Sequence, residues 1–294
     1  MIHRASIDEI RKFYAKLLFA ASKSDDPRLL RAFETVHREK FLPSPPWHIL
    51  ADGCYFETPS DDPAYVHNNA LVALDKTKGI NNGEPFLHAA WMGAAAPKAG
   101  DVITHIGAGM GYYTAILSLM ALPGGKVTGY ELDSRLAAKA QENLADFDNA
   151  EIINGDATAL SLPQADLIYV NAGVAAPPVT WLNSLRPQGR MIFPWRPSDT
   201  TGLTLLVARR ATGFEVKPLM ASWFIPCVGA SDLSGSVRTP DASEAWCVQS
   251  LWPNSARPPD ETAVAVYEHL WFSTAPFERE DGSHLQSDRM PLGR

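Results

Sequence analysis

The sequence predicts an α/β protein of Rossmann-like architecture, built on a mostly parallel sheet of seven strands. From Asp101 onward short apolar segments alternate with helical ones, the pattern of a parallel sheet covered on both faces. A three-glycine turn follows the first of these strands, and two strands without a helix between them end the series as an antiparallel hairpin. We expect a helical N-terminal cap with a substrate-side loop at 1–70, a core at 71–230 and a partly irregular C-terminal extension at 231–294.

Composition and charge narrow the possible partners. The 294 residues are 46% hydrophobic and 20% charged, which is typical of a globular protein. The net charge is −7 and no cluster of five basic residues occurs, so we expect no nucleic-acid partner. No apolar run reaches about 18 residues, and the first residues do not resemble a signal peptide. The three cysteines lack metal-ligand spacing, so we expect a cytoplasmic protein with reduced thiols, no metal and no membrane partner.

Two helices are expected in the N-terminal cap. The capping box Ser6–Glu9 opens a helix over Ile7–Ala20, and an Asp-Pro pair begins a second helix over 26–36. The segment 44–63 is rich in proline, aspartate and aromatic residues, and we expect it to be a loop. Its aromatic side chains either line a substrate pocket or pin the loop to the core, and the sequence leaves both alternatives open.

The core elements follow from the periodicity of apolar residues. The expected strands are Asp101–Ile106, Lys126–Glu131, Glu151–Asn154, Asp166–Val170 and Arg190–Pro194, and the expected helices are Tyr112–Met120, Ser134–Ala145 and Val179–Ser184.

The last two core strands form the expected antiparallel hairpin. They are Leu203–Ala208 and Trp223–Val228, with Gly213 between them, and we expect Trp223–Val228 to lie antiparallel between its neighbours. In the extension, Val264–Phe272 has strand propensity and is a candidate edge strand. The charged segment 278–294 is expected to be mobile.

The glycine turn points to a nucleoside-binding unit. Gly107, Gly109 and Gly111 stand at alternate positions directly after the first core strand and open the following helix. Glycine there lets the backbone turn tightly and approach a ligand that a Cβ would exclude. The first amides of the helix point into the same space. Glu131, twenty residues after Gly111, closes the next strand, where a carboxylate can accept hydrogen bonds from ribose hydroxyls.

The spacing of the glycines favours one class of nucleoside. In a dinucleotide fingerprint the third glycine lies five residues after the first, but here it lies four after, and no triphosphate-loop pattern follows. The G-x-G-x-G form, with Glu131 and the later pair Gly155-Asp156, resembles the S-adenosylmethionine (SAM) site of class I methyltransferases. A closing antiparallel hairpin is also usual in that fold. We therefore expect SAM as the cofactor.

Flanking segments resemble one family within that class, the protein-L-isoaspartate O-methyltransferases. The matches cover about residues 28–230, in the family's order. Val36–Pro43 resembles the family's PREKFVP, Ala64-Tyr65 its AY pair, Gly79–Phe86 its GQTISQPY, Leu185–Pro194 its LKPGGRLVIPV, and Phe224-Ile225-Pro226 its FVP. The resemblance implies SAM-dependent methyl transfer.

The departures from the family pattern fall on the acceptor side. The family's serine aligns with Gly83 and its glutamine with Glu84, while His67 and His105 stand where the family has acidic residues. The glycines, Glu131 and the later aspartate remain. We therefore expect cofactor binding to be kept and substrate recognition to be changed.

The expected cofactor site extends beyond the glycine turn. The resemblance implies that Asp156 accepts a hydrogen bond from the adenine amino group and that Ala157 packs beside the ring. Tyr112 either covers the methionine part of SAM or simply begins the helix. Asn171 lies where ligands of open α/β sheets collect, although an asparagine that caps a turn fits equally well.

Glu84 and His88 are the candidate catalytic residues. An amine, phenol or thiol acceptor must lose a proton, and these two side chains could supply the base. A structural, hydrogen-bonded histidine is the alternative for His88. A carboxylate acceptor would be repelled by Glu84, by about 4 kcal/mol at about 4 Å and an effective dielectric near 20.

Three functions follow from this pattern. The first is a SAM-dependent methyltransferase with an altered acceptor site, acting on a small molecule or a peptide and negligibly on isoaspartyl peptides. The second is a genuine protein-L-isoaspartate O-methyltransferase that tolerates Gly83. The third is a SAM-binding accessory protein without catalysis.

Overall fold

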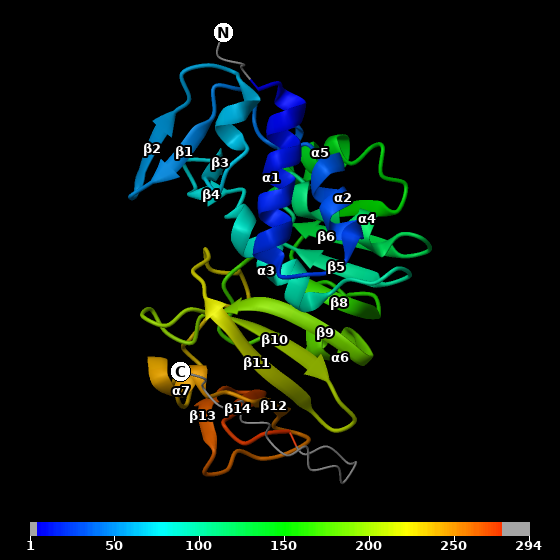
Figure 1. Ribbon diagram of the computed structural model, residues 1–294. Coiled ribbons are helices and arrows are strands. Elements are labelled where there is room, and N and C mark those ends of the chain that lie inside the picture. The colour runs from blue at the N-terminus through cyan, green and yellow to red at the C-terminus, as the bar shows by residue number, and fades with distance from the viewer. Residues whose placement is uncertain (1–4, 278–294) are drawn as a thin grey trace, which may run out of the picture.

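The computed structural model describes residues 5–277, so the segment 278–294, expected to be mobile, lies outside the described residues. Two β-sheets organise the fold (Figure 1). A large sheet of ten strands runs through the molecule in the order β13-β14-β12-β11-β10-β9-β8-β5-β6-β7. A small sheet of four strands, β2-β1-β3-β4, stands beside the N-terminal helix.

The parallel half of the large sheet carries the glycine turn. Its strands are β5 (Val102–Ile106), β6 (Lys126–Glu131), β7 (Ala150–Asn154), β8 (Ala165–Val170) and β9 (Leu185–Trp195). The pairs β5–β6, β5–β8, β6–β7 and β8–β9 are all parallel. The carboxyl ends of these five strands therefore meet at one edge of the sheet, where ligands of open α/β folds bind. These strands agree with the sequence prediction, and the α/β fold class is confirmed.

The antiparallel half of the sheet is larger than expected. It contains β10 (Leu203–Arg209), β11 (Phe214–Ala221), β12 (Ser250–Pro253), β13 (Ala263–Val266) and β14 (Leu270–Ser273). The sheet has ten strands rather than seven because the C-terminal extension adds β12, β14 and β13 to its end. The candidate edge strand Val264–Phe272 is in fact a hairpin, β13 and β14, with β13 at the edge. The proposed division of the chain at residues 70 and 230 stays a prediction.

The predicted strand Trp223–Val228 is wrong. The hairpin partner of β10 is β11, and it is β10 that lies antiparallel between its neighbours. Pro218 weakens the strand pattern of β11, and the ladder accommodates it opposite Leu205, where the register shifts. The segment 223–228 instead crosses the carboxyl edge of the sheet, where the Gly173 N–H donates to the Ile225 carbonyl.

Helices cover both faces of the large sheet. On β8 the side chains alternate, so that Leu167 and Tyr169 pack toward one face and Ile168 and Val170 toward the other. The first face is covered by α1 (Ile7–Ser22), α2 (Pro27–Thr35), α3 (Pro85–Ala95), α4 (Tyr112–Ala121) and α5 (Ser134–Asn143). The second face is covered by α6 (Val179–Ser184), α7 (Ala242–Trp246) and the strands of the extension. The expected caps are present at α1 and α2, and both helices lie on one face of the sheet.

The segment 44–63, expected to be a loop, contributes a hairpin to the small sheet. This sheet consists of β1 (His48–Ala51), β2 (Cys54–Glu57), β3 (Leu71–Asp75) and β4 (Ile80–Asn81), and two short 3-10 helices, η1 (Arg38–Phe41) and η2 (Pro63–Val66), flank it. Asp52 and Gly53, both with positive φ, form the β1–β2 turn. An Asp-Gly pair at such a turn is a strong hairpin signal that the sequence analysis missed.

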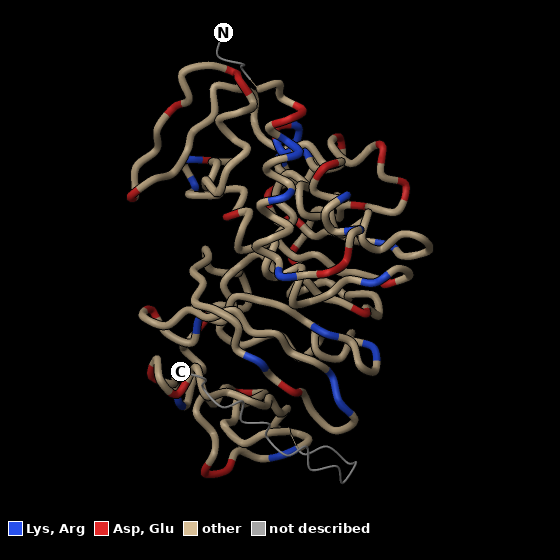
Figure 2. Tube along the Cα trace, in the orientation of Figure 1, with Lys and Arg blue, Asp and Glu red and all other residues tan. Residues whose placement is uncertain are grey.

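Charge is distributed over the whole trace rather than gathered on one face. Along residues 5–277, Figure 2 shows Lys and Arg interspersed with Asp and Glu on every part of the fold. None of the helices in this part of the chain is long and apolar enough to cross a membrane.

A buried arginine joins the N-terminal cap to the small sheet and to the start of α3. The side chain of Arg38 is fully buried, and none of its acceptors is a carboxylate. Its guanidinium donates to the Asn82 amide oxygen and to four backbone carbonyls, those of Val66, Asn68, Ala70 and Gly83. These acceptors lie in one stretch of chain that includes β3 and β4. The planar guanidinium therefore fixes the path of residues 66–83.

We predict that Arg38→Lys destabilises the protein by about 2–4 kcal/mol. A lysine ammonium cannot reproduce the planar fork of donors, so several buried carbonyls lose their partners. Urea unfolding measures the change. Arg31→Lys, at an exposed position on α2, is the matched control and should stay within about 0.5 kcal/mol of the wild type. Equal stability of the two variants would contradict the structural role of Arg38.

Candidate functional site

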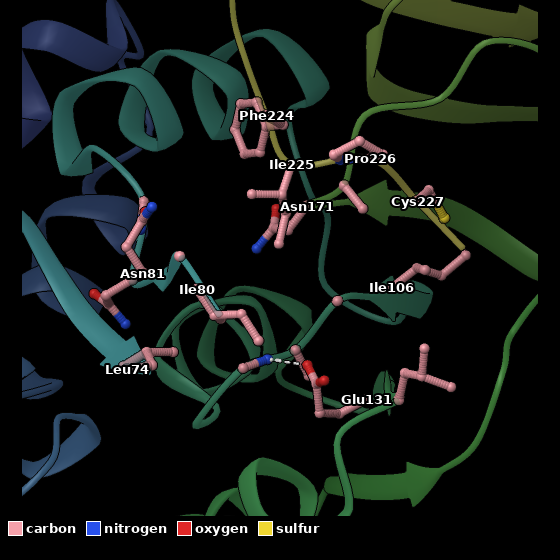
Figure 3. Close-up of a pocket in the computed structure, with 18 of the residues that line it drawn as sticks. Leu74, Ile80, Asn81, Ile106, Glu131, Asn171, Phe224, Ile225, Pro226 and Cys227 are labelled. Carbon is pink, nitrogen blue, oxygen red and sulfur yellow. Dashed lines mark hydrogen bonds between the residues drawn. The ribbon is translucent and has the colours of Figure 1, made fainter. Parts of the chain in front are cut away.

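A cavity of about 1210 Å³ lies at the carboxyl edge of the parallel strands. The glycine turn after β5, the end of β6 and the residues that follow β7, β8 and β9 form its floor. The walls come from the β3–β4 hairpin, the start of α3 and the segment 223–228. Figure 3 shows Leu74, Ile80 and Asn81 on one side of this space and Phe224–Cys227 on another.

The glycine turn and Glu131 form one hydrogen-bonded unit. The Gly109 N–H donates to Oε2 of Glu131 at 2.7 Å (Figure 3). The Asp133 N–H donates to Oε1 at 2.9 Å. Gly107 and Gly109 have positive φ, and a Cβ on Gly109 would come within 3.0 Å of Leu74. Burial raises the pKa of Glu131, against the lowering effect of the two amide hydrogen bonds. The unit therefore places a carboxylate beside a stretch of backbone that a ligand can approach closely, because the glycines have no side chains.

Asp156 and Ala157 line the same cavity after β7. Oδ1 of Asp156 accepts hydrogen bonds from the backbone N–H and the hydroxyl of Thr158, whereas Oδ2 has no partner among the described residues. Ala157 is buried, and its carbonyl accepts a hydrogen bond from the Trp181 indole. One carboxylate oxygen is therefore free to accept from a ligand next to a small apolar side chain.

Asn171 lies in the floor of the cavity and is held by His105. Nδ2 of Asn171 lies 2.9 Å from Nε2 of His105, and Nδ1 of His105 lies 2.8 Å from the Thr114 hydroxyl. Burial lowers the pKa of His105 to about 3, so the imidazole is neutral near neutral pH. Oδ1 of Asn171 is buried and has no hydrogen-bond partner among the described residues. An unpartnered acceptor in the lining of a cavity is a natural position for a donor group of a ligand.

Gly83 and His88 meet in the wall of the cavity formed by the β3–β4 hairpin and the start of α3. A Cβ built on Gly83 would lie 2.4 Å from Nε2 of His88, and Gly83 has a φ of +73°. The imidazole therefore occupies the space that any side chain at position 83 would need. This arrangement gives a physical reason for glycine at 83, in the position where the resemblance had placed a serine.

The imidazole of His88 is buried and tightly positioned. Nδ1 lies 2.9 Å from the Tyr169 hydroxyl, and the ring stacks on Tyr113 with 3.8 Å between centroids. Nε2 makes no hydrogen bond with a described residue. Burial lowers the pKa of His88 well below its usual value, with smaller contributions from His105 and Arg38. His88 is therefore a neutral imidazole whose Nε2 can donate or accept, depending on the tautomer.

Glu84 lines the cavity but is exposed to solvent. It is the N-cap residue of α3, and its side chain makes no capping hydrogen bond. The repulsion expected from this charge assumed an effective dielectric near 20. At an exposed carboxylate the dielectric is closer to that of water, and the interaction falls to about 1 kcal/mol at about 4 Å. The argument from Glu84 against a carboxylate acceptor is therefore weak.

Two of the expected cofactor residues do not reach the cavity. Gly111 packs against α5, where a Cβ would lie 3.2 Å from Leu144, so this glycine serves helix packing. Tyr112 is buried against Phe41 and begins α4, so it does not line the cavity. The next residue, Tyr113, lines the cavity instead, because successive residues of a helix point about 100° apart. The sequence analysis missed Tyr113, and also Arg196 and the segment 223–228.

A nucleoside cofactor with a charged tail fits these residues. The glycine turn leaves an open cradle, Glu131 offers a carboxylate for ribose hydroxyls, and Asp156 has a free oxygen for an amino group. The buried, unpartnered Oδ1 of Asn171 can accept from an ammonium group. The donor and acceptor chemistry is that of SAM, with its adenosine, ribose diol and amino-acid tail.

Comparison with known proteins identifies the family. The model of the protein-L-isoaspartate(D-aspartate) O-methyltransferase (PCMT) family matches residues 16–232. The chain belongs to this family. It is therefore one of the SAM-dependent methyltransferases, which disfavours the non-catalytic accessory protein.

Curated relatives bear the same name. The chain is 28% identical over 224 residues to the protein-L-isoaspartate O-methyltransferase of Pelotomaculum thermopropionicum, covering 74% of this chain and 87% of that protein. It is 30% identical over 210 residues to the enzyme of the same name from Brucella anthropi, covering 69% and 87%.

Solved structures show the shared fold. A protein-L-isoaspartate O-methyltransferase superposes with a TM-score of 0.63 at 23% identity, over 74% of this chain and 65% of that one. This chain thus spans about two thirds of that protein. A putative PCMT from Plasmodium falciparum, in complex with S-adenosyl-L-homocysteine, gives a TM-score of 0.60 at 19% identity, over 74% and 97%.

We predict that His105 makes the protein sensitive to acid. Its pKa is about 3 in the folded protein and near 6.5 in the unfolded chain, so between these values the unfolded chain binds more protons. The free energy of unfolding therefore falls as the pH drops below 6.5, by up to about 1.4 kcal/mol per pH unit for this residue. His105→Gln should flatten the dependence measured by urea unfolding between pH 6.5 and 4.5.

The control is His269→Gln, which changes an exposed histidine. It should keep the wild-type dependence on pH. If His105→Gln lost stability with pH as steeply as the wild type, the neutral, buried state of His105 would be wrong. His88 is buried in the same way, so part of the dependence should remain in His105→Gln.

Proposed function

We propose that this protein is a SAM-dependent carboxyl O-methyltransferase whose acceptor is not an isoaspartyl peptide. Membership of an O-methyltransferase family supports transfer to a carboxylate oxygen. The observation that carries the altered acceptor is the contact between Gly83 and His88. An imidazole fills the position next to residue 83, so an acceptor meets a ring nitrogen there in place of a hydroxyl.

The cofactor residues have distinct proposed roles. Gly107 and Gly109 bring the backbone close to the cofactor, and Glu131 accepts hydrogen bonds from its ribose. Asp156 accepts from the adenine amino group, and Asn171 accepts from the ammonium group. When bound, SAM supplies a methyl group activated by the positive sulfonium. The protein then has to hold the acceptor oxygen in line, and alignment of bound reactants can save about 7–11 kcal/mol of barrier.

His88 is proposed to position the acceptor. A carboxylate is ionised near neutral pH and needs no general base, so a neutral imidazole with a low pKa suits this reaction. If the Tyr169 hydroxyl donates to Nδ1, Nε2 carries the proton and can donate to one acceptor oxygen. The second oxygen keeps its lone pairs for the methyl group. The role of Glu84 as a base stays a prediction for acceptors that must lose a proton.

A genuine protein-L-isoaspartate O-methyltransferase is the second candidate. The family model covers most of the chain, and the curated relatives carry that name over most of their own length. This candidate requires that His88, rather than a residue at 83, contacts an isoaspartyl carboxylate. The proposal also includes a cytoplasmic location, supported by Cys54, Cys227 and Cys247, which form no disulfide.

We predict that Glu131→Ala weakens the binding of S-adenosylhomocysteine by about 1–3 kcal/mol, because polar groups of the ribose lose their partner. Gly109→Val should abolish binding, since a side chain there meets Leu74 and the φ of +57° is strained. Calorimetry measures both. Glu142→Ala, at an exposed site on α5, is the matched control and should bind like the wild type. Undetectable binding to the wild type would remove the proposed cofactor.

We predict that labelled methyl from SAM is transferred as a base-labile ester to a carboxylate acceptor, with negligible turnover of isoaspartyl peptides. The assay compares capped peptides with a single isoaspartyl, α-aspartyl, glutamyl or asparaginyl residue, together with metabolite pools. Rapid methylation of the isoaspartyl peptide would favour the second candidate. A base-stable label would exclude carboxyl transfer altogether.

The contact between Gly83 and His88 adds a sharper variant test. Gly83→Ser with Glu84→Gln should not create isoaspartyl activity, because the new side chain collides with Nε2 of His88. Adding His88→Ala to this pair frees the space, and the triple variant should show more isoaspartyl methylation than the double variant. Equal activity of the two would mean that His88 does not control this position.

A further inference from the structure

Arg196 is an arginine in the cavity lining that has no acidic partner among the described residues. It follows the last residue of β9 and lines the cavity at the carboxyl edge of the sheet. The other Lys or Arg in the lining, Lys78, forms an ion pair with Asp133. In a protein with a net charge of −7, a cation left unpaired beside a cavity requires an explanation.

Three contacts hold the Arg196 side chain in place. Nη1 donates to the Phe224 carbonyl at 2.8 Å, and the guanidinium carbon lies 4.5 Å from the centre of the Trp223 ring. The aliphatic part passes Gly173, where a Cβ would lie 2.6 Å from Cδ of Arg196. The side chain is therefore positioned before any ligand binds.

The donors that remain form a fork. Nε of Arg196 is buried and has no hydrogen-bond partner among the described residues, and Nη2 makes no hydrogen bond with them either. Nε–H and the adjacent Nη2–H point in the same direction in a planar guanidinium, which is the geometry that binds both oxygens of a carboxylate. A buried donor without a partner costs free energy that a bound anion would recover.

Phe224 links Arg196 to the wall of the cavity that carries His88. Its carbonyl receives the hydrogen bond from Arg196, and its ring contacts the ring of His88 edge-on, with 5.8 Å between centroids. Figure 3 shows Phe224 and Cys227 at opposite ends of the labelled part of this segment. One residue, Phe224, thus contacts both Arg196 and His88.

We propose that Arg196 forms an anion-binding subsite that takes a carboxylate of the methyl acceptor on its Nε–Nη2 edge. This inference rests on the proposed function and deepens it, because it names a residue that selects acidic acceptors. The amino-acid tail of SAM also carries a carboxylate. The test therefore separates binding of the acceptor from binding of the cofactor.

The experiment titrates capped peptides into the full-length protein saturated with S-adenosylhomocysteine, by calorimetry. The probes are a peptide with one α-aspartyl residue, its isoaspartyl isomer and the neutral asparaginyl peptide. In the wild type, at least one acidic peptide should bind at least tenfold more tightly than the asparaginyl peptide. Arg196→Gln should remove this preference, and Arg196→Lys should keep only part of it, because the charge remains without the fork.

Two controls isolate the effect. Arg210 follows β10, forms an ion pair with Glu215 and does not line the cavity. Arg210→Gln should therefore keep the wild-type preference for acidic peptides. The affinity of each variant for S-adenosylhomocysteine is measured alone, and Arg196→Gln should leave it unchanged. Thermal unfolding of the Gln and Lys variants shows whether either has lost its fold.

Three results would overturn the proposal. The first is that the wild type shows no preference for the acidic peptides. The second is that the preference persists in Arg196→Gln. The third is that Arg196→Gln loses affinity for S-adenosylhomocysteine. The last would assign the carboxylate to the cofactor. Methyl transfer is measured separately, so a failure of the proposed reaction with the binding preference intact would leave the subsite standing.

Discussion

The buried guanidinium of Arg38 is the constraint on which one wall of the cavity depends, the wall built by the β3–β4 hairpin and the start of α3. A cation removed from water must be surrounded by acceptors, and here backbone carbonyls and one amide oxygen provide them without a carboxylate. Those carbonyls belong to residues 66–83. If this segment took another path, the Arg38 guanidinium would lose its hydrogen-bond acceptors or become exposed to solvent. The small sheet and the approach to α3 are therefore fixed by one side chain from the N-terminal cap, and with them the position of Gly83.

The position of Gly83 in turn explains which polar atom this wall of the cavity presents. Because Gly83 has no side chain, the space that a side chain would occupy there is open to a neighbouring residue. The imidazole of His88 fills this space. Burial keeps that imidazole neutral, and the Tyr113 and Tyr169 side chains leave only Nε2 without a partner. A polar atom is thus retained beside position 83 although the glycine there has no side chain. The side of the cavity next to the glycine turn needs no added polar side chain, because the backbone of the turn and the Glu131 carboxylate provide its polar groups.

The elements and residues that could be predicted from the sequence are those determined by their neighbours along the chain. The strand, glycine turn, helix and terminal glutamate are contiguous, so β5, α4 and β6 could be assigned, as could Asn171 from its place after a strand. The same rule, applied after β9, would have found Arg196. The error at Trp223–Val228 has a physical cause: an extended apolar run suits a cavity wall as well as a strand, while Pro218 disguised β11. The packing of His88 against Gly83 joins residues through tertiary structure, and no spacing in the chain reveals it.

The C-terminal extension also acquires a physical role. Its strand β14 places Phe272 against Trp195, with 4.6 Å between ring centroids, and the Trp195 indole donates to the Ala175 carbonyl. Trp195 is the last residue of β9, and Arg196 follows it, with its own N–H bound to the Val174 carbonyl. The extension thus supports the strand end that carries the unpaired arginine, from the face of the sheet opposite α1–α5. A supported strand end keeps Arg196 beside the cavity, so residues outside the matched family segment contribute to the cavity lining through β9.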